Sequence, residues 1–381
     1  MASVRRAVGT VKEGAELAGA LALSQPRITG TGSSQKFDNP WPEWQEKGLT
    51  EVFGWAWKRR GLAPATGCLL EHPKPTPADF ARAFPVSPPN YAAKANPPGE
   101  AVQAFWLGHA SCLVQMEGFT FLTDPVFSQR CSPVQWMGPR RVVQPALSLE
   151  DPKLPPIDFV LISHNHYDHL DYASVMQLHK RFGKHLAWYV PLGLARWFKG
   201  VGVQNVHEMG WWQEAQLPQS SVTLACLPAQ HWSSRSGTDR RQTLWCGWAV
   251  MGAAQRFWFA GDTGYCGVFK EIGQKYGPFD LSAIPIGAYD PRWLMKPQHI
   301  DPAEAVQIHQ DVKSHRSFGI HCCTFNLTDE PLDEPPQLLI KAVEAAGLPP
   351  DAFVALQHGA MLQTANGVDL QHPLTMQRRQ H

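Results

Sequence analysis

The segment that most constrains this chain is "FVLISHNHYDHLD", residues 159–171, in which a short apolar run ends in histidines and aspartates. A continuous apolar run of this length predicts a buried strand, and α/β proteins collect their ligands where such strands end. His164 and His166, two residues apart, can point the same way, and Asp168 and His169 follow in the next turn. A lone histidine is usually an ordinary core or surface residue, but this spacing at a strand end predicts a metal site.

Three later apolar strands also end in side chains that can bind a metal ion. "LACLPAQ" precedes His231, "FWFAG" precedes Asp262 and "SFGI" precedes His321. Seven ligands are too many for one tetrahedral ion and suit two ions that share a carboxylate. Imidazole and carboxylate donors favour zinc, although iron and manganese bind similar sets. The predicted metal ligands are His164, His166, Asp168, His169, His231, Asp262 and His321.

The order of the expected elements indicates the fold class. From residue 101 onwards, short strands alternate with helical patterns, and Glu117-Gly118 marks a turn between two of the strands. Helical spacing is clear over residues 172–182, and a second helix over 301–312 begins at Asp301, a residue type that caps helices. Strands with interleaved helices predict a layered α/β fold whose sheets are covered by helices.

Composition divides the chain into four expected segments. Residues 1–38 are expected to be a flexible or targeting segment, and basic residues near the start leave a mitochondrial targeting helix as an alternative. Residues 39–98 are rich in proline and read as an arm with one helix near 49–60. The catalytic domain is expected over 99–365, and a tail over 366–381.

Charge and cysteine content narrow the function class. The net charge of +1 gives no overall attraction to nucleic acid. The eight cysteines form no C-x-x-C pair and suggest no disulfide framework, which favours reduced residues in an intracellular protein. No apolar run reaches the length that crosses a bilayer. The fifteen tryptophans fit either a lipid-facing surface or a large core.

Longer blocks around the histidine motif resemble the N-acyl-phosphatidylethanolamine-hydrolysing phospholipase D family of the metallo-β-lactamase superfamily. They include "WLGHAS", "FLTDPVFSQRCSPVQWMGPRR", "LPPIDFVLISHNHYDHLDY", "FAGDTGYC" and "GAYDPRWLMKPQHIDP", and the similarity runs from about Asn39 to near Gly359. The resemblance implies an αββα sandwich with two Zn²⁺ ions at one edge. It assigns one ion to His164, His166 and His231, the other to Asp168, His169 and His321, and a bridging position to Asp262.

The same resemblance implies a zinc-dependent phosphodiesterase that hydrolyses N-acyl-phosphatidylethanolamine to N-acylethanolamine and phosphatidic acid. It suggests Asp262 and His299 as catalytic residues. Tyr167 and His299 match positions that contact the substrate head group, and Gln135 is expected to line the site. Cys322-Cys323 departs from the Trp-Gly pair of animal members, and a lysine that binds bile acid in the family is replaced in "QHWSSRSG", which puts bile-acid activation in doubt.

A lipid substrate requires contact with a membrane. Trp55 and Trp57, beside the basic stretch Lys58 to Arg60, suit a head-group interface, although such aromatic residues can equally pack against a core. On the resemblance we expect peripheral association with intracellular membranes and a homodimer.

Other hydrolase and lipid-binding functions are alternatives. The chain could be another hydrolase of the same fold, either a lactonase or a different phosphodiesterase, or a non-catalytic lipid-binding relative. "HPKPTPAD" matches once the H-x-K-x-x-x-x-D motif of a second phospholipase D superfamily, through His72, Lys74 and Asp79. That chemistry requires two copies of the motif, and no second copy is present.

Overall fold

The computed structural model describes residues 24–59, 76–88, 90–95, 99–365, 368–369 and 375–376. The predicted targeting helix near the start, most of the predicted tail, and His72 and Lys74 lie outside these residues.

Two mixed β-sheets form the centre of the molecule. The first sheet contains, in spatial order, β17 (Val368–Asp369), β16 (Met361–Ala365), β3 (Val102–Gly108), β4 (Ser111–Met116), β5 (Phe119–Thr123), β6 (Phe159–Leu161), β7 (Ala187–Pro191) and β8 (Val206–Met209). The second contains β15 (Phe353–Val354), β14 (Ser314–Ile320), β13 (Phe279–Pro285), β12 (Arg256–Phe259), β11 (Gly247–Met251), β10 (Thr223–Leu227) and β9 (Glu214–Gln216). Strands β5 to β8 are parallel in the first sheet, as are β12 to β15 in the second.

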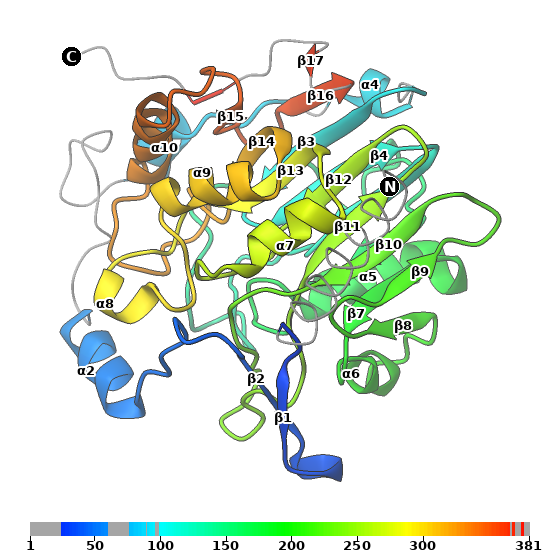
Figure 1. Ribbon diagram of the computed structural model, residues 1–381. Coiled ribbons are helices and arrows are strands. Elements are labelled where there is room, and N and C mark those ends of the chain that lie inside the picture. The colour runs from blue at the N-terminus through cyan, green and yellow to red at the C-terminus, as the bar shows by residue number, and fades with distance from the viewer. Residues whose placement is uncertain are drawn as a thin grey trace, which may run out of the picture.

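Helices cover the outer faces of the two sheets (Figure 1). The first sheet carries α5 (Tyr172–Phe182) and α6 (Ala195–Gly200), and the second carries α7 (Val268–Lys275), α9 (Pro302–Asp311) and α10 (Glu334–Ala345). The predicted αββα sandwich is therefore confirmed. No helix among the residues described here combines the length and the hydropathy that crossing a membrane would require.

The alternation of side chains along β3 shows how the layers form. Val102, Ala104 and Trp106 point into the core between the sheets, whereas Phe105 and Leu107 join the apolar cluster under α5 and α6. Successive residues of a strand face opposite sides, so a strand buried on both faces is apolar throughout. A large apolar side chain such as Phe105 or Leu107 contributes about 1.5–3 kcal/mol when fully buried.

Local signals in the sequence agree with the elements observed. The turn between β4 and β5 places Glu117 and Gly118 at positive φ, 50° and 81°. The α5 helix spans the residues expected for it. The Asp301 side chain accepts a hydrogen bond from the Glu304 backbone N–H, so Asp301 caps α9 as expected.

The segment before the sandwich packs against it. It contains β1 (Arg27–Thr29), the short 3₁₀ turn Gly32–Ser34, β2 (Lys36–Asp38), α2 (Leu49–Arg59), α3 (Pro77–Ala83) and α4 (Tyr91–Ala95). The Asn39 side-chain amide donates to the His231 carbonyl (2.8 Å), and the Trp41 ring stacks on Trp211. The α2 helix and α8 (Arg292–Met295), both at the lower left of Figure 1, contribute residues to one cavity. A second 3₁₀ turn, Gly183–His185, follows α5.

Candidate metal centre

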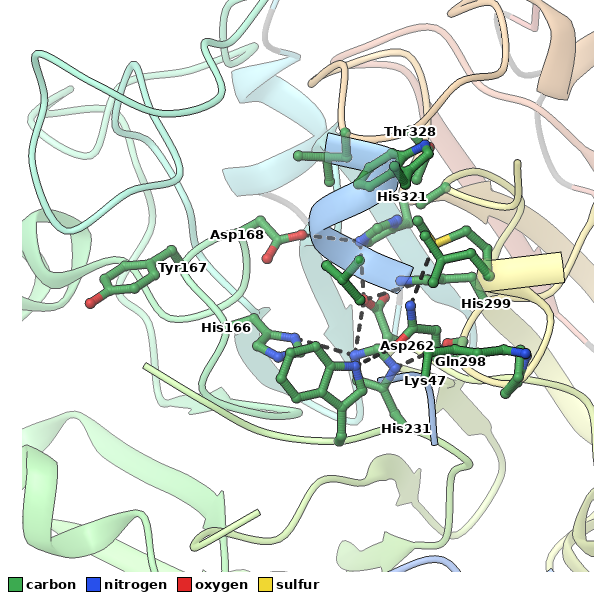
Figure 2. A pocket seen from close by; sticks show the side chains of 18 of the residues that line it. Lys47, His166, Tyr167, Asp168, His231, Asp262, Gln298, His299, His321 and Thr328 are labelled. Carbon is green, nitrogen blue, oxygen red and sulfur yellow. Dashed lines mark hydrogen bonds and ion pairs between the residues drawn. The ribbon is translucent and has the colours of Figure 1, made fainter. Parts of the chain in front are cut away.

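The seven side chains singled out in the sequence meet where strands of the two sheets end. The loop after β6 carries four of them, and the segments after β10, β12 and β14 carry one each. Figure 2 shows Asp262 between His231 and His321. Gly261 makes this placement possible, because it has a φ of 63° and a Cβ there would lie 2.7 Å from the Cys246 carbonyl oxygen.

Three histidines form the first half of the cluster. His166 Nδ1 lies 2.8 Å from His164 Nε2 and 3.3 Å from His231 Nε2. Asp262 Oδ2 is 4.0 Å from the first Nε2 and 3.7 Å from the second. Ligands about 2 Å from a tetrahedral ion lie roughly 3.3 Å from one another, so these separations suit one small divalent cation.

Asp168, His169 and His321 form the second half. His321 Nε2 lies 3.1 Å from His169 Nε2 and 3.3 Å from Asp168 Oδ2. Asp262 Oδ2 is 3.1 Å from each of the two imidazole nitrogens. One oxygen of Asp262 therefore faces both halves, as a bridging ligand would.

Asp124 determines which nitrogen of two histidines faces the centre. Its Oδ2 accepts a hydrogen bond from His169 Nδ1–H (2.7 Å) and another from the Ser163 hydroxyl (2.5 Å). Because that hydroxyl proton goes to Asp124, the Ser163 oxygen accepts from His164 Nδ1–H (2.9 Å). In His164 the lone pair of Nε2 then points into the cluster, as it does when an imidazole binds a metal, and Nε2 of His169 faces the cluster in the same way.

The ring of His231 has the same orientation, which is fixed by a backbone carbonyl and not by Asp124. Its Nδ1 lies 3.0 Å from the Gln298 carbonyl oxygen, which can only accept, so Nδ1 carries the proton and Nε2 the inward lone pair. Burial lowers the pKa of His164 and of His231 well below the ordinary value, and lowers that of His166 to about 4. These imidazoles are therefore neutral at pH 7, the form that binds metal ions.

The carboxylates complete the donor set. Burial alone would raise the pKa of Asp262, but His169 and His321 beside it hold that pKa well below its usual range. Within the described part of the chain, Asp262 Oδ1 and His166 Nε2 are buried without a hydrogen-bond partner. Burial alone would lower the pKa of His169 and of His321, but Asp262 and Asp168 raise the first well above its ordinary value and the second to about 9, so a cation bound beside them would displace their protons. The neutral imidazoles of His164, His166 and His231, the ionised carboxylates and an unpaired buried oxygen fit a site for one or two divalent cations.

Five residues of the cluster line a cavity of about 430 Å³: His166, Asp168, His231, Asp262 and His321. His299 lines this cavity, and its Nδ1 lies 3.9 Å from Asp262 Oδ2 without a partner among the described residues. Burial lowers the pKa of His299 to about 4. Tyr167 also lines the cavity, but its hydroxyl donates to the Arg235 carbonyl (2.8 Å) and points away from the cluster (Figure 2).

Two residues that the sequence analysis named lie away from this cluster. Gln135 was expected to line the site, but its exposed side chain folds back on the backbone N–H and carbonyl of Arg130 and is not part of the cavity wall. Asp79, from the second phospholipase motif, forms a capping box with Thr76 at the start of α3.

The sequence analysis did not name Asp124 or His109 as site residues. Asp124 directly follows β5, so the rule that polar side chains at strand ends collect at one edge could have found it. His109 is buried in the turn after β3, and its Nε2 lies 3.0 Å from Asp168 Oδ2. His109 directly follows β3, so the same rule could have found it as well.

A family model described as "Beta-lactamase superfamily domain" matches residues 120–322, which include all seven side chains of the cluster. The chain belongs to the beta-lactamase superfamily. Within this superfamily it is a hydrolase with a candidate metal centre. His109 lies outside the matched residues.

Two relatives with named activities are similar to this chain over most of the catalytic domain expected from the sequence. The chain is 44% identical over 273 residues to N-acyl-phosphatidylethanolamine-hydrolyzing phospholipase D 1 of Caenorhabditis elegans, an alignment that covers 69% of this chain and 76% of the relative. It is 35% identical over 248 residues to the mitochondrial N-acyl-phosphatidylethanolamine-hydrolyzing phospholipase D of Saccharomyces cerevisiae, covering 64% and 52% of the two chains. The resemblance stated from the sequence is thus confirmed.

Solved structures support the fold alone. Igni18, a metallo hydrolase of Ignicoccus hospitalis, superposes with a TM-score of 0.53 at 20% identity and covers 69% of this chain and 98% of its own. Isothiocyanate hydrolase from Delia radicum gut bacteria gives the same TM-score at 18% identity, covering 68% and 98%.

Proposed function

We propose that this chain is a zinc-dependent phosphodiesterase that hydrolyses N-acyl-phosphatidylethanolamine to N-acylethanolamine and phosphatidic acid. The observation that carries the proposal is the cluster of seven donors, five of which line the cavity, in a chain 44% identical to an enzyme named for this reaction. The donor types suit zinc. His164, His166 and His231 would hold one ion, Asp168, His169 and His321 the other, and Asp262 would bridge them.

The reaction cleaves the P–O bond on the ethanolamine side of the phosphodiester. Two bound zinc ions would supply a nucleophile at neutral pH and offset the charge on the phosphoryl oxygens. Asp262 lines the cavity with one oxygen unpaired among the described residues, so it can accept a proton from the attacking water. His299, neutral at pH 7, can donate a hydrogen bond from its unpaired Nδ1 to a phosphoryl or leaving oxygen.

Turnover of a substrate panel by the purified protein tests the proposal. N-acyl-phosphatidylethanolamine should yield phosphatidic acid and N-acylethanolamine, and ordinary phosphatidylethanolamine should react more slowly. Faster hydrolysis of a lactone would favour the lactonase alternative, and hydrolysis of a soluble nucleotide diester at a comparable rate would favour another phosphodiesterase. Binding of the lipid without product, in protein that retains its metal, would favour a non-catalytic lipid-binding protein.

Replacing His299 with alanine is expected to lower kcat by about 10²–10³-fold, the usual effect of removing one donor to a transition-state oxygen. The metal content should stay unchanged, because His299 is not one of the proposed ligands. Steady-state kinetics on N-acyl-phosphatidylethanolamine and metal analysis of the same preparation check both statements. Full turnover in the variant would remove His299 from the mechanism.

We also propose that the cavity opens onto a membrane surface. Three elements line the cavity, and each carries a large exposed apolar side chain: Trp57 on α2, Trp136 in the loop after β5 and Trp293 on α8, which are 71%, 75% and 53% exposed. Lys47 and Arg240 contribute positive charge to the same cavity. Aromatic and basic side chains together suit the head-group region of a bilayer.

We further propose peripheral association with intracellular membranes, with a mitochondrial location as the alternative, and a homodimer.

Changing Trp57, Trp136 and Trp293 to serine, one at a time, is expected to weaken vesicle binding by roughly tenfold each, since burying such a side chain contributes about 1–3 kcal/mol. Sedimentation with phosphatidylethanolamine vesicles measures the binding. Ile28→Ser is the matched control, because Ile28 is 57% exposed on β1, which does not line the cavity. Hydrolysis of a short-chain, micelle-free substrate should stay constant in all four variants. Equal vesicle binding by wild type and the tryptophan variants would contradict this membrane-facing surface.

A further inference from the structure

His109 occupies an unusual position for a histidine. It follows β3 with a φ of 54° and is 1% exposed. The left-handed backbone region is unfavourable for a residue other than glycine. Its Nε2 lies 3.0 Å from Asp168 Oδ2, and a carboxylate oxygen facing an imidazole in this way accepts, so Nε2–H donates.

The other ring nitrogen of His109 has no compensating contact. With the proton on Nε2, Nδ1 is an acceptor, and it is buried without a hydrogen-bond partner among the described residues. An unpaired buried polar atom is destabilising, and in a native protein it calls for an explanation. Stability alone would favour an apolar residue here, because Phe325 already packs edge-on against the ring.

The backbone of His109 is held on both sides. Its N–H donates to the Thr324 hydroxyl (2.7 Å), and its carbonyl accepts from the Trp106 indole N–H (2.8 Å) and from the His321 backbone N–H (3.0 Å). The ring itself packs on the His321 ring, with centroids 4.0 Å apart. These bonds keep the imidazole in one place despite the strained φ.

All of these contacts with proposed ligands fall on one half of the cluster. His109 bonds to the Asp168 side chain and the His321 backbone, and its ring centroid lies 5.5 Å from that of His169. His109 makes none of these contacts with His164, His166 or His231. His109 is also the one donor to Asp168 Oδ2, within the described residues, that is not itself a proposed ligand.

We propose that His109 is a positioning residue that determines occupancy of the second metal position, by holding Asp168 Oδ2 towards His169 and His321. The inference rests on the dinuclear centre of the proposed function but not on the identity of the substrate. Partners of this kind behind a metal ligand affect metal affinity by about 10–100-fold, because they restrict the ligand to the binding orientation.

The His109→Phe and His109→Gln variants test this role. Phenylalanine keeps the ring packing on His321 and Phe325 but removes the N–H donor. Zinc titration monitored by calorimetry should show two equivalents in wild type. In His109→Phe the second equivalent should bind about 10–100-fold more weakly, and the first should be unaffected. His109→Gln places an amide N–H near the position of Nε2 and should recover most of the second affinity.

His309→Phe is the matched control, since His309 is likewise a buried histidine with one hydrogen bond, from Nδ1 to the Ser317 hydroxyl (2.8 Å). It should retain both metal equivalents even if its melting temperature falls. Two equivalents of wild-type affinity in His109→Phe would overturn the inference. A wild type that binds a single equivalent would overturn the dinuclear centre and this inference together. Failure to hydrolyse N-acyl-phosphatidylethanolamine, with the metal titrations as expected, would overturn the proposed function alone.

Discussion

Asp262→Asn is expected to abolish turnover, with a fall of at least about 10³-fold, and to reduce zinc binding to less than two equivalents. Oδ2 of Asp262 lies 3.1 Å from both His169 Nε2 and His321 Nε2 and 3.7 Å from His231 Nε2, so it serves both halves of the cluster. Asparagine is neutral and cannot accept a proton at neutral pH. Both the proposed bridging position and the proposed proton acceptor are therefore lost at once.

Asp280→Asn provides the control for this change. Asp280 is a buried aspartate on β13 whose Oδ2 accepts a hydrogen bond from the Arg256 backbone N–H (2.8 Å). Its replacement should affect stability and leave metal content intact. Steady-state kinetics and metal analysis of the two variants test the assignment of Asp262. Retention of two zinc ions and wild-type turnover in Asp262→Asn would contradict it.

Treatment with a chelator is expected to eliminate hydrolysis, and added Zn²⁺ to restore it. Nε2 of His164 and Nε2 of His231 each direct a lone pair into the cluster and have no proton to share, so a bound cation is the partner that satisfies both. Metal bound only to the folded state also adds to stability, by about 4 kcal/mol at a thousand times the dissociation constant. The melting temperature should therefore fall on chelation and recover with zinc.

Chelation also separates the two phospholipase D chemistries. A covalent phosphohistidine at His72 requires no metal and would survive a chelator, whereas the metal centre would not. The His72→Ala variant is the companion measurement, and it should retain wild-type turnover. Activity that resists exhaustive chelation, with metal content shown to be below one equivalent, would contradict the proposed centre.

The sequence predicts the centre well where ligands follow strands directly. The apolar run before His164 and the later runs before His231, Asp262 and His321 each specify a strand end, and parallel strands present these ends at a common edge. The α5 helix and the Asp301 cap were equally accessible, because helical spacing and capping are local properties.

Other features depend on contacts that are distant in sequence. The Tyr167 hydroxyl donates to a carbonyl 68 positions away. Gln135 pairs with Arg130 within its own irregular loop, where no regular element indicates the direction of a side chain. His109 follows β3 directly, but its contact with Asp168, 59 positions away, is set by the packing of the two sheets and not by any local pattern. For such residues the sequence shows only the residue type, and the packing of the two sheets determines which groups the side chain contacts.

The donor set straddles the boundary between the two sheets. His164, His166, Asp168 and His169 follow β6 of the first sheet, whereas His231, Asp262 and His321 follow β10, β12 and β14 of the second. In the proposed dinuclear centre each ion would take ligands from both sheets and so link the sheets at that edge. Loss of the ions would then allow the two sheets to separate first at the edge that carries the ligands, while the apolar core between them stayed packed.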